Sequence, residues 1–102
     1  MGLTIVLQEK GGKILETVED PTNVLRGVLP GPDAEDFPYL RYVDPYGDTI
    51  FNRLQMSPFL LEWGALARRT SSAEAQAILR TVRRLAETCA EEVHCFLRFV
   101  GD

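Results

Sequence analysis

The chain has 102 residues, of which 45% are hydrophobic and 25% are charged. These values are typical of one soluble globular domain, and a chain of this length buries roughly 60–70% of the surface that it exposes when unfolded. The formal net charge is −4, and an acidic surface repels phosphate backbones. We therefore expect residues 1–102 to form a single globular domain that does not bind nucleic acid.

The N-terminal residues carry no targeting signal, since they lack a basic region and become polar at Gln8. No apolar run approaches the ~20 residues that span a bilayer. Cys89 and Cys95 are the only cysteines, and on one helix their spacing would point them about 240° apart, which prevents a disulfide. Free thiols fit a reducing compartment. We expect a cytoplasmic protein without membrane contact.

The first half of the chain contains patterns of a hairpin and a short helix. Residues 3–8 and 13–18 are β-prone runs on either side of Gly11 and Gly12, which predicts a β-hairpin. Asp20 followed by Pro21 favours a helix start, and apolar residues at helical spacing extend the helix to Leu29. The segment 30–36 contains prolines and acids and is expected to be an exposed acidic loop.

A second hairpin is predicted next, with strands at residues 37–43 and 48–52 around a turn at 44–47. The inward candidates are Leu40, Tyr42, Ile50 and Phe51.

The second half has two amphipathic helical patterns. Ser57 and Pro58 predict the start of a helix that ends at Arg69, and Trp63 lies on its apolar stripe. A capping box at 71–74 predicts a longer helix to residue 93. Residues 94–100 fit either a strand or a continuation of this helix. We favour the strand, because a helix of nearly thirty residues is long for so small a domain.

These elements predict the α+β class: a small antiparallel sheet from two β-hairpins, joined by a C-terminal strand if residues 94–100 are extended, packed against two long helices and one short helix. The segment 96–100 is apolar and is followed directly by Gly101 and Asp102. We expect this terminus to lie against the body of the protein, beside the polar turn.

The segment 42–55 is unusually rich in hydrogen-bonding side chains around one Pro/Gly turn. Two interpretations remain open: a recognition surface, or a hydrogen-bonded structural corner. Tyrosine and arginine concentrate binding energy at interfaces, whereas aspartates beside turns often accept hydrogen bonds from backbone N–H groups. The candidate binding residues are Tyr42, Asp44, Tyr46, Asp48, Thr49, Asn52, Arg53 and Gln55.

Known catalytic and cofactor patterns are weak in this sequence. His94 is the only histidine, and the serines at 57, 71 and 72 are expected to cap helices. Cysteines and histidine supply three zinc ligands without the usual spacing, and no glycine-rich loop leads into a helix. Asp44 and Asp48 flank a turn and could act as an acid/base pair or ligate a hard cation. We predict no catalytic residues, metal site or cofactor.

The run from Asp44 to Gln55, together with the closing segment 96–102, resembles a group of short, functionally uncharacterised bacterial cytoplasmic proteins. Their pattern is a Tyr-Gly-Asp-Thr turn, an amphipathic helix pair and a chain that ends in Gly-Asp. The resemblance covers about the C-terminal two thirds of the chain and implies no particular activity. Small acidic domains of this kind are also similar in character to polymorphic-toxin immunity proteins, which inhibit by binding.

Two classes of function follow. The first is a non-catalytic protein-binding module of the inhibitor or immunity type, whose acidic region 33–48 suits a basic protein partner. The alternative is a small enzyme or ligand-binding domain that uses Asp44, Asp48, Asn52 and His94, and it requires these four residues to line one pocket. Homo-oligomers through a sheet edge or the Trp63 helix are a third expectation.

Overall fold

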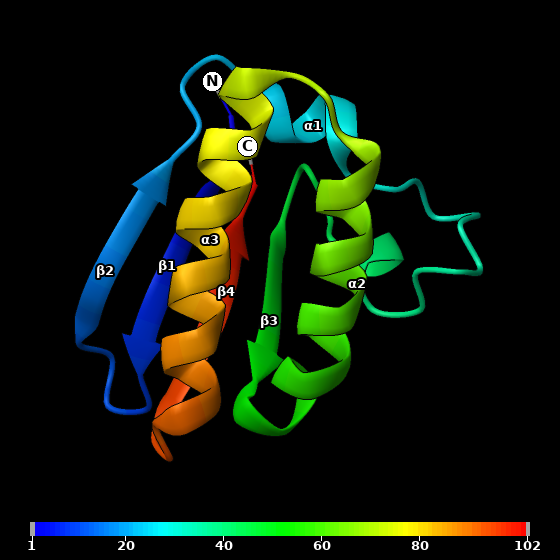
Figure 1. Ribbon diagram of the computed structural model, residues 1–102. Helices are drawn as coiled ribbons and strands as arrows, with labels where there is room; N and C mark the ends of the chain where they lie inside the picture. Colours follow the sequence, from blue (N-terminus) through cyan, green and yellow to red (C-terminus); the bar gives the residue numbers. More distant parts are fainter. Residues whose placement is uncertain (1, 102) are drawn as a thin grey trace.

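The computed structural model describes residues 2–101 as an antiparallel sheet with both long helices on one face (Figure 1). None of the helices in this part of the chain has the length and apolar character needed to cross a membrane. The α+β prediction is confirmed. The elements are β1 (Thr4–Glu9), β2 (Ile14–Glu19), α1 (Val24–Val28), η1 (Leu40–Tyr42, a 3-10 turn), β3 (Asp48–Asn52), η2 (Arg53–Gln55, also 3-10), α2 (Met56–Arg69), α3 (Ala73–Glu91) and β4 (Cys95–Val100).

The strand order in the sheet is β2-β1-β4-β3, with every neighbouring pair antiparallel. The first predicted hairpin is confirmed as β1 and β2. The ambiguous segment 94–100 is a strand, because α3 ends at Glu91 and β4 turns back into the centre of the sheet. Cys95, Leu97 and Phe99 are buried beneath the helices, as alternation along a half-buried strand predicts.

The second predicted hairpin is wrong, because residues 37–43 form turns and η1 instead of a strand. Phe37, Leu40 and Val43 are the buried residues of this segment, and their spacing of three matches the 3-10 period. Without that strand, β3 pairs with β4 instead. Of the four inward candidates, Leu40 and Phe51 are buried, whereas Tyr42 is 62% exposed and Ile50 is 55% exposed.

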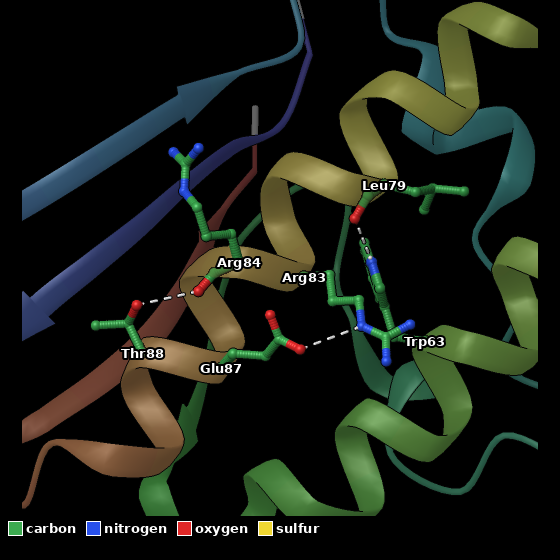
Figure 2. Close-up of polar contacts among 6 residues, drawn as sticks. All are labelled: Trp63, Leu79, Arg83, Arg84, Glu87 and Thr88. Atoms are coloured by element: carbon green, nitrogen blue, oxygen red, sulfur yellow. Dashed lines mark hydrogen bonds and ion pairs between the residues drawn. The ribbon is translucent and has the colours of Figure 1, made fainter.

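An aromatic cluster fills the space between the sheet and α2. Phe59 stacks on Trp63 with ring centroids 5.3 Å apart, and Phe99 meets Phe51 edge-on at 5.8 Å. Trp63 is 1% exposed, and its indole N–H donates to the Leu79 carbonyl of α3 at 2.9 Å (Figure 2). Trp63 is therefore a core residue that ties the helices together, and it is not available as an anchor for self-association.

The starts of the helices differ from prediction by small shifts. The side chain of Ser72, and not that of Ser71, caps α3 by accepting from the Ala75 N–H. Helix α2 begins at Met56 directly after η2, so Ser57 and Pro58 lie within its first turn. The real cap of this helical run is Asn52, described below.

A buried carboxylate connects α2 to the irregular segment before β3. Glu62 is 8% exposed, and its two oxygens accept hydrogen bonds from the backbone N–H groups of Tyr39 and Leu40 at 2.9–3.1 Å. These are the free N–H groups at the start of η1, where a negative charge is favourable. Glu62 thereby fixes the position of the segment that carries Arg41 and Tyr42.

We predict that Glu62→Ala lowers the free energy of unfolding by about 2–4 kcal/mol, because it leaves buried N–H groups without their charged acceptor. Glu87→Ala is the matched control, since Glu87 is exposed and, among residues 2–101, pairs only with Arg83, at 3.5 Å (Figure 2). Its loss should change the same quantity by no more than about 0.5 kcal/mol. Urea unfolding followed by circular dichroism measures both, and equal effects would contradict the anchoring role of Glu62.

Candidate functional site

The eight candidate binding residues do not form one site. The structure places them in three regions: the turn at 44–47 with the preceding η1, the face of the sheet away from the helices, and the junction of β3 with η2. The first region holds Tyr42, Asp44, Tyr46 and Thr49, the second holds Asp48, and the third holds Asn52, Arg53 and Gln55.

The turn at 44–47 is stabilised by its own polar side chains. Asp44 Oδ1 accepts from the Tyr46 N–H at 2.9 Å, and Thr49 Oγ1 accepts from the Asp44 N–H at 2.9 Å. Gly101 lies against this turn and donates its N–H to the Gly47 carbonyl at 2.8 Å. A Cβ at Gly101 would lie 2.6 Å from the Gly47 nitrogen, so only glycine permits this approach. The expected docking of the C-terminal segment beside the polar turn is confirmed.

Two tyrosines project from this region, and an arginine stacks on each of them. The guanidinium of Arg26 lies 4.6 Å from the ring centroid of Tyr46 and also donates to its hydroxyl. The guanidinium of Arg41 lies 4.8 Å from the ring centroid of Tyr42 and donates to its hydroxyl at 2.8 Å. Tyr42 and Tyr46 are 62% and 66% exposed. We call these four residues the tyrosine–arginine surface.

The arginines of this surface border a small apolar hollow of about 180 Å³. Neither Arg26 nor Arg41 lies in a salt bridge with any residue between positions 2 and 101. The Arg41 Nε is buried and has no hydrogen-bond partner among those residues. Both guanidinium charges therefore lack an internal counterion in the described part of the chain. The walls of the hollow are formed by Leu3, Leu29, Pro30, Pro32, Val43 and Pro45.

Asp20 holds the helix that supplies Arg26. This residue is 2% exposed, and its two carboxylate oxygens accept from the N–H groups of Val24 and Leu25 at 2.9 and 2.7 Å. Asp20 therefore caps α1 as predicted, but the helix begins three residues later than Pro21 suggests, after Asn23 in the left-handed region. A fixed α1 in turn fixes the direction from which Arg26 reaches Tyr46.

Asp48 belongs to a different surface. Arg98 lies between β1 and β3 on β4, and its Nε is 3.6 Å from Asp48 Oδ2 while its Nη1 donates to Gln8 at 3.2 Å. Cys95, Leu97 and Phe99 of β4 face the helices, so alternation along the strand directs Arg98 to the opposite face of the sheet, which the two long helices do not cover (Figure 1). Asp44 and Asp48 therefore have separate partners, and the structure does not assemble them as a carboxylate pair.

Asn52 and Gln55 form a capping box at the start of η2. The Asn52 side chain accepts from the Gln55 N–H at 3.1 Å, and the Gln55 side chain accepts from the Asn52 N–H at 2.8 Å. These two side chains satisfy backbone groups that the start of a helical run leaves free. The structural interpretation holds for this part of the polar segment.

The alternative four-residue pocket is not assembled. Asn52 and His94 do line one hollow of about 320 Å³, together with Lys10 and Arg53. Asp48 and Asn52 occupy opposite ends of β3, about 14 Å apart at the usual rise of about 3.4 Å per residue. The hollow includes neither Asp48 nor Asp44, so the proposed acids do not meet the proposed base. Within residues 2–101, no three His, Cys, Asp or Glu side chains are grouped to hold a metal ion.

The two cysteines are free and buried, on α3 and β4 instead of on one helix. The pKa of Cys89 is raised from 9.0 to about 11, mainly by burial and also by the charge of Cys95, while Arg53 acts in the opposite direction. Burial also raises the pKa of Cys95, with Glu9 and Glu92 adding to the effect. Both thiols are therefore protonated at neutral pH and poorly suited to nucleophilic attack.

Arg26 was not among the residues selected from the sequence. It lies twenty positions from Tyr46, and a single arginine on a short helix carries no local signal of such a contact. Arg41 stood out only as the one base in the acidic region 33–48.

We predict that Asn52→Ala and Gln55→Ala each lower the free energy of unfolding by about 1 kcal/mol, the usual cost of a lost cap. The double variant should lose less than the sum, because the two side chains stabilise the same turn. Asn52→Asp keeps the acceptor oxygen and serves as the control. Urea unfolding measures all four proteins, and full additivity would contradict a shared capping box.

The raised pKa of Cys89 predicts a pH dependence of stability. The pKa of this thiol is 9.0 in the unfolded state and about 11 in the folded state, so the unfolded state releases its proton at lower pH. The free energy of unfolding should therefore fall as pH rises from 9 to 11, by up to about 1.4 kcal/mol per pH unit from this group. Cys89→Ala should show a shallower decline across the same range. Parallel curves for the two proteins would rule out this contribution.

No protein-family model matches the chain, and neither the curated proteins nor the solved structures contain a significant match to it.

Proposed function

We propose that this chain is a non-catalytic protein-binding module of the inhibitor or immunity type, and that the tyrosine–arginine surface binds the partner. The observation that carries the proposal is the exposure of Tyr42 and Tyr46, each held in place by a stacked arginine. Tyrosine and arginine are the residues that most often supply binding energy at protein interfaces.

The stacking matters because it reduces the cost of binding. A free surface tyrosine or arginine loses rotamer freedom when a partner covers it, at about 0.5–1.5 kcal/mol for each immobilised side chain. Here the guanidinium groups already hold the rings, and the hydroxyls already accept hydrogen bonds from the same arginines. The tyrosine–arginine surface is thus preorganised, and less side-chain entropy is lost when a partner binds.

The residues that hold the tyrosine–arginine surface in position do not belong to it. Glu62 fixes η1 from α2, Asp20 fixes α1, and Asp44 and Thr49 fix the turn. The rings themselves contribute little to the core, since they are mostly exposed. This arrangement separates the residues that hold the fold from the residues that meet a partner.

The region also carries an acidic border. Asp33, Glu35 and Asp44 are exposed and lie within eight positions of Arg41 in the sequence. A partner with basic groups opposite these acids would be attracted over a long range and oriented on approach. We therefore propose a basic or mixed-charge protein as the partner.

Affinity capture from extracts of the cells that make the protein tests the proposal, with partners identified by mass spectrometry and then purified. We expect the double variant Tyr42→Ala/Tyr46→Ala to bind the purified partner at least tenfold more weakly than the original chain in calorimetric titration. The free energy of unfolding should stay within about 1 kcal/mol, as is usual for surface changes.

Ile50→Ala is a matched control, since Ile50 is also exposed at 55% but lies on β3 opposite Arg98 of β4 and does not belong to the tyrosine–arginine surface. It should leave the affinity unchanged. Equal binding by all three proteins would reject the tyrosine–arginine surface as the interface. A large loss of stability in the tyrosine variant would instead assign the two rings a structural role.

A further inference from the structure

We propose that the hollow beside the tyrosine–arginine surface binds the C-terminal residue of the partner protein. The apolar side chain of that residue would enter the hollow, and its terminal carboxylate would lie between Arg26 and Arg41. This inference rests on the proposed function, because it specifies which part of a protein partner the surface receives.

The size and lining of the hollow select a single apolar side chain. Its volume is about 180 Å³, which is below the roughly 300–1,000 Å³ of sites that enclose a drug-sized molecule. Leu29, Pro32 and Val43 contribute to its walls. These side chains offer apolar contact and no hydrogen-bonding groups, so a polar side chain that does not reach Arg26 or Arg41 would lose its hydration there without compensation.

The charge at the border selects a carboxylate. Arg26 and Arg41 both line the hollow, and neither has a salt-bridge partner among residues 2–101. A guanidinium presents parallel N–H donors that match the two oxygens of a carboxylate. The contacts with Tyr46 and Tyr42 restrict both guanidinium groups in advance, which lowers the entropy lost on binding.

A C-terminal residue provides both the apolar side chain for the hollow and the carboxylate for the two arginines. In an extended peptide, neighbouring side chains point to opposite sides, so an internal acid next to an apolar residue points away from the hollow that the apolar residue fills. A terminal residue instead carries its carboxylate one bond from the Cα that bears the apolar side chain. Capture of a terminal carboxylate is a recurring mode of peptide recognition.

The acidic border restricts the residues that precede the terminus. Asp33 follows directly after the hollow-lining Pro32, and Asp44 precedes the hollow-lining Pro45. Both aspartates are exposed and would repel an acidic segment. The partner's preceding residues are therefore basic or neutral, and this repulsion contributes to specificity.

The test is an NMR titration of the isotope-labelled full chain with synthetic hexapeptides of the form Gly-Lys-Ser-Lys-Gly-X, where X is valine, leucine or phenylalanine. Each peptide is made once with a free terminal carboxylate and once as the terminal amide. A third form, amidated and with glutamate in place of the last glycine, tests an internal carboxylate. We expect saturable shifts of the amide signals of Leu3, Leu29 and Val43 with at least one free acid, and binding at least tenfold weaker for its amide and its glutamate form.

Variants of the protein locate the binding. Arg26→Gln and Arg41→Gln should each weaken binding of the free acid at least tenfold. Arg80→Gln makes the same change in charge on the exposed face of α3, and it should leave the affinity within twofold. Urea unfolding confirms that each variant is folded; if Arg41→Gln is not, Arg26→Gln on its exposed side chain decides the question.

Equal binding of acid and amide forms, no saturable shifts with any of the peptides, or equal losses in Arg26→Gln and Arg80→Gln would overturn the inference. These outcomes are distinct from failure of the proposed function. Partner capture that depends on the tyrosines, with no discrimination between acid and amide, rejects the terminal-carboxylate site alone. Partner binding that is unchanged in the Tyr42→Ala/Tyr46→Ala variant rejects the tyrosine–arginine surface as the interface, and with it the function proposed above.

Discussion

The carboxylate of Glu62 is the contact on which the exposed surface of this protein depends. It sits in the middle of α2, almost fully buried, and receives the first N–H groups of η1. The segment between α1 and β3 contains no strand, so it cannot be positioned by a sheet ladder. A single charged acceptor from the neighbouring helix does this instead, with Phe37, Leu40 and Val43 packed beneath the segment. The hydrogen bonds from η1 to Glu62 therefore also fix the positions of Arg41 and Tyr42.

The polar side chains of the segment 42–55 have different roles: some hold the local backbone in place, and others are free to contact another molecule. Asp44, Thr49, Asn52 and Gln55 bind backbone groups within a few residues of themselves. Such local hydrogen bonds shape turns and helix starts and leave little capacity for another molecule. The two tyrosines differ from these four residues in that their rings are mostly exposed and contact arginines instead of nearby backbone groups. The structural interpretation therefore holds for these four residues, and the recognition surface that we propose rests on Tyr42 and Tyr46.

The sequence was sufficient for the fold class, for the first hairpin and for both long helices, because each has a clear period or cap. The segment 94–100 fitted both a strand and a helix, and only the length of the alternative helix favoured the strand. It failed at residues 37–43, where aromatic and aliphatic residues near a turn resemble a strand. The decisive feature there was the spacing of three between Phe37, Leu40 and Val43, which is visible in the sequence once the 3-10 period is considered. Of the site, Tyr42 and Tyr46 were found from their residue type. Arg26 could not be found, because the contact depends on how α1 packs and no local pattern encodes it.

The position of β4 affects how the protein reaches its native state. This strand is the last in the described chain, yet it lies between β1 and β3 and provides all the backbone pairing between them. During synthesis the early hairpin and β3 remain unconnected until residues 95–100 have left the ribosome. Until then, the apolar side chains of the hairpin and of β3, including Ile5, Leu7 and Phe51, stay exposed to solvent. Sheets that close through distant pairings form slowly and expose apolar surface to aggregation while they form, so the folding of this sheet is expected to be limited by the late pairing of β4.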